Sequence, residues 1–207
     1  MKHFGIKNFE SLSKIYRLNL INSITGYKSA NLIGTQSLKG RENLAIFSSV
    51  IHLGSNPALI GFILRPTLVP RHTYQNLKAT GVFTINAVTK KYISDAHHTS
   101  AKYPENISEF DQTNLEIELK KEWKAPFVKG APIQMGCHYE NEYEIKENDT
   151  IMIVGSIQHL YVSDFLLSED GWIQLDKAGI VTINGLDGYS EPKHLRRFSY
   201  ARPKFYK

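Results

Sequence analysis

Residues Ser29–Asn86 read SANLIGTQSLKGRENLAIFSSVIHLGSNPALIGFILRPTLVPRHTYQNLKATGVFTIN. Short apolar runs rich in Ile, Leu, Val and Phe alternate here with Gly, Pro, Asn and Ser, a pattern typical of strands joined by tight turns. Turn residues are supplied by Lys39–Glu42 and by Gly54–Pro57. The pattern predicts four strands: Asn31–Ser37, Leu44–Leu53, Ala58–Leu64 and Val82–Val88.

A short helix is predicted between the third and fourth of these strands, at about Thr73–Thr80. A polar loop, Arg65 to His72, leads into it. Thr73 or His72 stands where a helix N-cap belongs, and Gly81 stands where a C-terminal glycine belongs.

Two features of this unit indicate chemistry. Polar residues occupy strand positions, as in Thr35, Ser37 and the Phe47-Ser48-Ser49 segment. Cations precede the helix, at Arg65 and in Arg71-His72-Thr73, and a helix N-terminus binds anions because its free N–H groups and its dipole point the same way. The alternative is ordinary structure, because Ser and Thr are tolerated in strands and basic loops are commonly solvated.

The order of these pieces resembles the flavin reductase-like family, the FMN-binding split barrels. The segments that carry the resemblance are Leu32–Ser37, Phe47-Ser48-Ser49, Asn56-Pro57, Arg71–Asn76 and Gly81–Asn86. Near the C-terminus, Gly185-Leu186-Asp187 with Tyr189, and Tyr200-Ala201-Arg202-Pro203, are similar to the flavoredoxin-type branch. The resemblance covers about residues 16 to 203.

The resemblance implies a mainly β fold: a split barrel of about six antiparallel strands, partly Greek-key, with a few peripheral helices. A barrel also removes the exposed edges that so many short strands would create. We expect one flavin reductase-like domain over residues 1–207, with a lead-in at 1–28 and a tail at 190–207. Members of the family are homodimers with the flavin near the subunit interface.

The resemblance also implies flavin-dependent redox chemistry, with FMN as cofactor and NADH or NADPH as electron donor. Phe47, Ser48 and Ser49 would face the pyrimidine side of the flavin through backbone groups and hydroxyls, where donors stabilise the charge that develops on reduction. Because hydride would pass straight to the flavin, no catalytic side chain is predicted. The other predicted FMN-binding residues are Thr35, Gln36 and Ser37 near the ribityl chain or phosphate, Arg71, His72 and Thr73 at the phosphate, and Asn31, Arg65 and Lys102.

One departure from the family pattern concerns the electron donor. Many short-chain flavin reductases have Gly-Asp-His at a late hairpin, with the His near the nicotinamide, whereas the corresponding turn here is Asn148-Asp149-Thr150. This weakens the case for pyridine-nucleotide oxidation and leaves FMN binding unaffected. The alternatives are a flavoredoxin-type FMN electron carrier reduced by a partner protein and, more distantly, a relative of the pyridoxamine phosphate oxidases.

The rest of the chain adds further predicted elements. Helices are expected at Phe9–Tyr16 and Lys90–Ala101, and strands at Ile133–Lys146 and Ile151–Val162, the second with a bulge or close backbone approach at Gly155. Trp123 should anchor the long excursion at 104–132. The period-two acidic residues of the first long strand indicate a solvated face rather than paired catalytic carboxylates: Glu140, Glu142 and Glu144.

Composition sets outer limits on the function. Hydrophobic residues make up 42% of the 207 residues, enough for a packed core, and the net charge of +5 favours an anionic ligand. A single cysteine, Cys137, argues against a disulfide framework, and His97-His98 lacks the spacing of a zinc helix. The interleaved basic and aromatic tail could indicate nucleic-acid binding, but the flavoredoxin-like strings account for it. With no signal-peptide or membrane-spanning pattern, we expect a cytoplasmic protein that binds neither nucleic acid nor membrane. Phosphate-loop, Rossmann and serine-hydrolase motifs are absent from the sequence.

Overall fold

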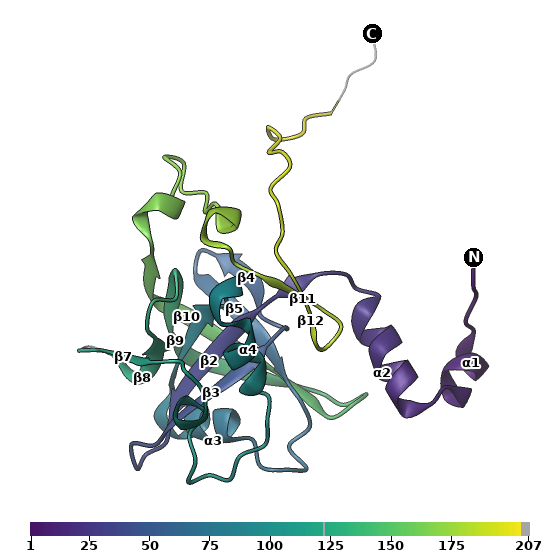
Figure 1. Ribbon diagram of the computed structural model, residues 1–207, viewed down its shortest axis with the longest axis horizontal. Helices are drawn as coiled ribbons and strands as arrows, with labels where there is room; N and C mark the ends of the chain where they lie inside the picture. Colours follow the sequence, from purple (N-terminus) through teal and green to yellow (C-terminus); the bar gives the residue numbers. More distant parts are fainter. Residues whose placement is uncertain (122, 204–207) are drawn as a thin grey trace.

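The computed structural model describes residues 1–121 and 123–203. Its centre is a seven-stranded sheet in the order β3-β2-β6-β9-β10-β5-β4, antiparallel throughout (Figure 1). The mainly β prediction is therefore confirmed. The strands are β2 (Asn31–Gln36), β3 (Glu42–Phe47), β4 (Ile51–Ser55), β5 (Ala58–Leu64), β6 (Val82–Ala87), β9 (Ile133–Ile145) and β10 (Thr150–Val162).

The prediction of one strand at Leu44–Leu53 is wrong, because β3 ends at Phe47 and β4 begins at Ile51. β3 pairs with β2 and β4 pairs with β5, at opposite ends of the sheet order, so the chain crosses between the two edges here. The Ser49 hydroxyl fastens this crossover to β5: it accepts a hydrogen bond from the Ile63 N–H (3.0 Å) and donates one to the Ile63 carbonyl (3.2 Å). The two edges are thereby drawn together, which curves the sheet towards a barrel.

The two largest hydrophobic clusters among the described residues lie on opposite faces of the sheet, and β2 contributes to both. Leu32 packs into the cluster that α4, the 104–116 segment and β11 help to form, while Ile33 packs into the barrel interior. This is why β2 is buried on both faces, with every residue from Asn31 to Thr35 buried, polar ones included. The interior cluster consists of Ile33, Ile60, Phe62, Leu64, Leu77, Phe83, Ile85, Cys137 and Ile153.

The helix after β5 is α3 (His72–Thr80), and it ends as predicted at Gly81, whose φ of 72° is left-handed. Its N-cap is Arg71, not His72 or Thr73. The Thr73 hydroxyl accepts a hydrogen bond from Asn43 instead of capping the helix. α3 and α4 (Ile93–His98) both lie against the barrel, with α3 at one end (Figure 1).

Two predicted helices have different bounds. Lys90–Ala101 is shorter than expected, with one 3₁₀ turn (Lys90–Tyr92) followed by α4. Phe9–Tyr16 is replaced by α1 (Ile6–Ser11) and α2 (Lys14–Ser23), because the Ser13 hydroxyl accepts a hydrogen bond from the Tyr16 N–H (3.4 Å) and begins a new helix.

The long hairpin of β9 and β10 is confirmed, and its register shifts between Val154 and Gly155 as predicted. A Cβ at Gly155 would lie 2.6 Å from the Phe83 Cζ, so the glycine permits a close approach of the core ring. Glu140 and Glu144 are exposed, whereas Glu142 is half-buried and accepts a hydrogen bond from the Tyr74 hydroxyl (2.9 Å).

The excursion after α4 contains a 3₁₀ helix (Glu109–Gln112) and a small hairpin of β7 (Ile117–Lys120) and β8 (Trp123–Val128). Trp123 anchors it as predicted: it is buried and donates from Nε1 to the Phe83 carbonyl (3.3 Å). After β10 come two further 3₁₀ turns, Asp164–Leu166 and Leu175–Ala178. The remaining strands, which the sequence did not indicate, form a three-stranded sheet: β1 (Lys28–Ser29), β11 (Thr182–Asn184) and β12 (Gly188–Ser190).

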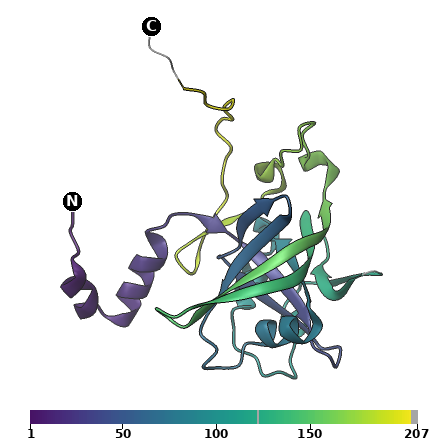
Figure 2. The same cartoon turned by 180° about the vertical axis from the view of Figure 1, so that it is seen from behind.

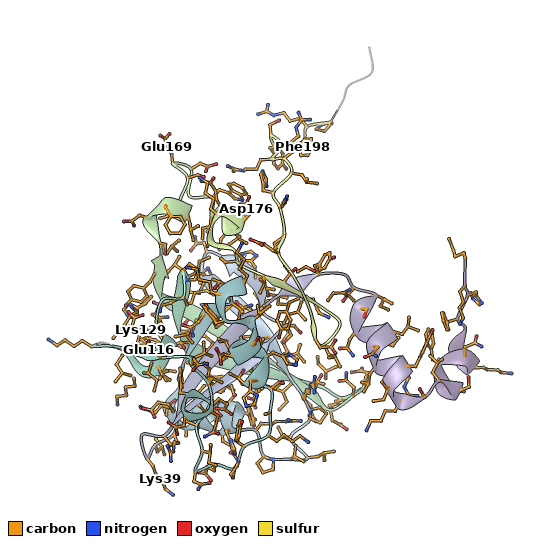
Figure 3. The ribbon with its side chains drawn as sticks, viewed as in Figure 1. Lys39, Glu116, Lys129, Glu169, Asp176 and Phe198 are labelled. Carbon is orange, nitrogen blue, oxygen red and sulfur yellow. The ribbon has the colours of Figure 1, made fainter. Side chains whose placement is uncertain are left out.

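Both ends of the chain stand away from the barrel (Figures 1 and 2). The labelled Phe198 lies on the C-terminal segment, well clear of the sheets (Figure 3). Among the helices that the structure describes, none is both long enough and apolar enough to cross a membrane.

Candidate functional site

The outer edge of β3 is where the site is built. β3 is an end strand, so every second residue points its backbone N–H and carbonyl away from β2. The Leu44 N–H is one such group, and it donates to the Glu109 carboxylate (2.9 Å). Strand alternation therefore turns the backbone of Ile46 outward as well, and within the described residues no hydrogen bond satisfies it.

A buried cluster of polar side chains connects β3 to β2 and to α3. The Asn43 side-chain amide donates to the hydroxyls of Thr35 (3.4 Å) and Thr73 (3.1 Å), and the Asn76 amide also donates to Thr35 (3.2 Å). All four residues are buried. Because the cluster links β2, β3 and the first turns of α3, it fixes the helix N-terminus relative to the strand edge.

Glu109 introduces a buried carboxyl group beside this cluster. Burial raises the pKa of Glu109, and this effect is opposed by the hydrogen bond from Leu44 and by the nearby His72. The hydrogen bond from Asn43 to Thr73 places the start of α3, and with it His72, next to β3. A carboxyl group, an imidazole and an open backbone edge thus come together.

A cleft of about 350 Å³ opens at this place, between the β2–β3 hairpin, α3 and the loop after α4. Of the predicted site residues, only Ser37 and His72 line it. Lys39 at the tip of the β2–β3 hairpin is labelled in Figure 3. The full lining is Ser37, Leu38, Lys39, Arg41, Glu42, Asn43, His72, Gln75, Asn76, Ala79, Glu105 and Ile107.

The predicted cations are placed at differing depths. Arg71 is half-buried as the N-cap of α3 and donates from Nε to the Pro66 carbonyl (3.4 Å). Arg65 and Lys102 are exposed and take part in none of the ion pairs found among the described residues. Arg71 therefore has the most defined position of the three.

The remaining predicted residues lie on the crossover and its neighbour strands. The Phe47 ring packs edge-on against Phe62 at 5.2 Å between centroids, so its side chain serves the core. Asn31 is buried and donates to the Ser29 hydroxyl (2.9 Å), which in turn donates to the Val50 carbonyl (3.1 Å). Ser48 is half-buried, and the Ser49 hydroxyl is already engaged with Ile63.

Gln36 and the turn at residues 148–150 make their hydrogen bonds locally. The Gln36 amide donates to the Gly40 carbonyl (3.2 Å) and to Glu42 (3.4 Å), within its own hairpin. At the tip of β9–β10, the side-chain oxygen Oδ1 of Asn148 accepts hydrogen bonds from the N–H (3.2 Å) and hydroxyl (2.7 Å) of Thr150. This turn is satisfied by its own side chains.

Four residues that matter to this site were not predicted: Asn43, Ile46, Asn76 and Glu109. The outward backbone of Ile46 can be inferred from the alternation of residues along β3, once the strand is known to end at Phe47. Asn76 was visible as part of a Thr-x-x-Asn helix start, without an indication that its amide would reach Thr35. No sequence signal marks Glu109, because it lies in a short 3₁₀ helix 65 residues away from Leu44 in the chain.

Comparison with known proteins bears on the family and the fold of this chain. The sequence model of the Flavin reductase like domain matches residues 27–171. The chain belongs to the flavin reductase-like family. A proposed flavin reductase with a split barrel domain from Shewanella frigidimarina is 42% identical, with a TM-score of 0.94 over 97% of this chain and 100% of that one. The split-barrel prediction is therefore confirmed.

Two further relatives of this flavin reductase-like protein show how widely the fold is shared. An uncharacterised protein of Methanothermobacter thermautotrophicus is 31% identical over 70% of this chain and 69% of its own length. The flavoredoxin of Desulfovibrio vulgaris (Miyazaki F) superposes with a TM-score of 0.73 over 84% of this chain and 91% of its own, at 20% identity. At that identity the similarity establishes the fold alone.

Proposed function

We propose that this flavin reductase-like protein binds FMN along the outer edge of β3 and uses NADH or NADPH to reduce it. The observation that carries the proposal is the open backbone edge at Ile46, on the strand whose other end, at Glu42 and Asn43, lines the cleft together with His72 of α3. An unpaired strand edge is suited to a flat, hydrogen-bonding ring such as isoalloxazine, because its free N–H and carbonyl groups need partners.

The pyrimidine side of the flavin would meet the backbone of Ile46 and Ser48. N–H groups held there favour the negative charge that develops on the ring when it is reduced, and they need no rearrangement to do so. When bound, FMN supplies the hydride-accepting chemistry. The Ser49 hydroxyl would hold the crossover in place through Ile63, so its contribution to flavin binding would be indirect.

The phosphate would lie at the start of α3, held by Arg71 and His72 together with the first free N–H groups of the helix. The buried Thr35 and Thr73 would act as supports, because their hydroxyls are occupied by Asn43 and Asn76. Arg65 and Lys102 are exposed cations that add attraction for the anion at longer range.

Physiologically, we expect a cytoplasmic homodimer. A titration of apoprotein with FMN tests the central claim, since a flavoprotein develops flavin absorbance with a defined stoichiometry. Bleaching of that absorbance by NADH or NADPH without oxygen supports the reductase. Colourless protein that does not take up added FMN contradicts the whole proposal.

A second candidate is a flavoredoxin-type electron carrier reduced by a partner protein. The observation that favours it is the turn Asn148-Asp149-Thr150, which satisfies its own polar groups and offers no histidine for a nicotinamide. Yellow protein that neither nucleotide bleaches, but that a chemical reductant does bleach, supports this alternative.

A further inference from the structure

Glu109 is a buried carboxyl group on the β3 edge, at a position where the fold does not need an acid. It opens the 3₁₀ helix Glu109–Gln112, is only 6% exposed, and accepts the Leu44 N–H at 2.9 Å. A side-chain amide would accept the same hydrogen bond without the cost of burying an ionisable group. A buried ionisable side chain beside a proposed binding edge is therefore a candidate for a role in binding.

The short helix that carries Glu109 is fastened to the barrel at two further points. Phe110 packs into the same hydrophobic cluster as Leu44 of β3. From the β2–β3 hairpin, the Arg41 guanidinium pairs with the carboxylate of Asp111 (3.4 Å). These contacts flank Glu109 in the chain, so its carboxyl group is held against β3.

The start of α3 lies next to the same part of β3. Asn43, the residue before Leu44, donates to the hydroxyl of Thr73 (3.1 Å) in the first turn of the helix. Burial raises the pKa of Glu109, and the charge of His72, the first residue of α3, opposes this rise as a smaller effect. A charge at the start of α3 therefore acts on the carboxyl group of Glu109.

The other charged or titratable groups on the elements around Glu109 have partners of their own or lie exposed at the rim of the cleft. An anion beside His72 would consequently act on Glu109 without a buried cation between them to offset it. The groups with partners are Arg41 and Asp111, which pair with each other, Glu42, which accepts from the Gln36 amide (3.4 Å), Asp95 of α4, which accepts from the Asn114 N–H (3.2 Å), and His97 and His98 of α4, which contact the hydroxyls of Tyr189 and Tyr103; the exposed ones are Lys39 and Glu105.

We propose that Glu109 determines how strongly this site prefers phosphorylated flavin over riboflavin. The inference rests on the proposed position of the FMN phosphate at the start of α3. A phosphate monoester carries about −1.5 to −2 charges at pH 7, so an ionised Glu109 repels it and a protonated Glu109 does not. Riboflavin has no phosphate, and its affinity is indifferent to the charge of Glu109.

The sign of the pH dependence follows from linkage. The preference for FMN that a neutral Glu109 permits is present at low pH and is lost as the pH rises through the folded pKa of this group. Conversely, a bound phosphate raises the pKa of Glu109 further, so FMN binding adds a proton to the protein in that range. Glu109→Gln keeps an acceptor for Leu44 and stays neutral at every pH.

Titrations of apoprotein with FMN and with riboflavin, followed by flavin fluorescence between about pH 5 and pH 9, test the proposal. At the alkaline end, Glu109→Gln should bind FMN about tenfold more tightly than wild type, the size expected for charges several ångströms apart in a partly buried site. The difference should vanish at the acid end, and riboflavin should bind both proteins equally throughout. Glu105→Gln, which removes an exposed charge from the rim of the same cleft, is the matched control and should change FMN affinity less than about threefold at any pH.

Calorimetry in two buffers of different ionisation enthalpy counts the protons taken up with FMN. Wild type should take up more protons than Glu109→Gln near the folded pKa of Glu109. FMN binding that Glu109→Gln leaves unchanged at every pH overturns this inference alone, and so does a gain that is equal for FMN and riboflavin or equal at both ends of the pH range. Apoprotein that binds neither flavin contradicts the proposed function itself, and this inference with it.

Discussion

Replacing Ser49 by Ala removes one hydroxyl that makes two hydrogen bonds to the same residue, and it should destabilise the fold. The hydroxyl accepts from the Ile63 N–H at 3.0 Å and donates to its carbonyl at 3.2 Å. Each net hydrogen bond contributes about 0.5–1.5 kcal/mol, and an unsatisfied group that stays out of water costs about 1–3 kcal/mol. Ile63 is half-buried, so partial access of water offsets some of this cost. We expect the free energy of unfolding to fall by about 2 kcal/mol.

Urea denaturation measures this change. With a slope of about 2 kcal/mol per molar urea, the midpoint of the Ser49→Ala variant should move down by roughly 1 M with no change in slope. Ser48→Ala is the matched control, because the hydroxyl of Ser48 makes no hydrogen bond among the described residues, and its free energy of unfolding should stay within about 0.5 kcal/mol of wild type. Ser49→Thr keeps the hydroxyl and should recover most of the loss.

Flavin affinity separates this role from a direct one. If Ser49 acts through the backbone, Ser49→Ala loses about 1 kcal/mol of FMN affinity or less, whereas Ser49→Pro loses far more because the donor is removed and the crossover is distorted. Equal stability of the Ser48 and Ser49 alanine variants would refute the argument that the hydroxyl joins the two edges. Equal loss of FMN affinity from Ser49→Ala and Ser49→Pro would refute the backbone role.

The remaining predictions concern the phosphate, the buried carboxyl group and the bulge. Arg71→Ala should cost roughly 1.5–3 kcal/mol of FMN affinity with little effect on riboflavin in parallel titrations, and an equal loss for both flavins would make Arg71 structural. The raised pKa of Glu109 means that its favourable contribution is fully present below about pH 4.5 and is lost as the pH rises through the folded pKa. Glu109→Gln, which keeps an acceptor for Leu44, should therefore gain stability relative to wild type across that window, and parallel denaturation curves at all pH values would contradict this. Gly155→Ala should lower the free energy of unfolding by about 1–3 kcal/mol, because its Cβ would lie 2.6 Å from Phe83, and an unchanged melting midpoint would show that the ring can move aside.

The strands were predictable where local pattern and pairing agree. β9 and β10 are long and joined by turn residues, so their positions follow from the sequence, as does the irregularity at Gly155. The segment 44–53 was predicted as one strand because it is mostly apolar. Its two halves pair with different strands, β3 with β2 and β4 with β5, and this interrupts the segment at 48–50. Nothing local distinguishes a serine that bonds a distant strand from one that faces water.

The site was predictable in outline and not in its contacts. The Thr35 and Thr73 hydroxyls looked like ligand contacts because small polar side chains in strands and at helix starts often are. Their burial beneath Asn43 and Asn76 depends on β3 and α3 packing together, which involves residues separated by 30 and 41 positions in the chain. The pairing of Glu109 with Leu44 likewise requires the whole fold, since an acid in a polar loop is ordinarily solvated.

The edge of β3 shows how the fold treats an exposed strand. An open edge invites pairing with other chains, and proteins usually cover or interrupt it. Here Leu44 is covered by the carboxylate of Glu109, and the chain beyond Phe47 is turned away and fixed to β5 by Ser49. Between these two fastened points, the outward backbone groups of Ile46 stay open over a few residues, a length suited to one side of a planar ring. A gap of this length between two fastened points is consistent with the flavin-binding edge proposed above.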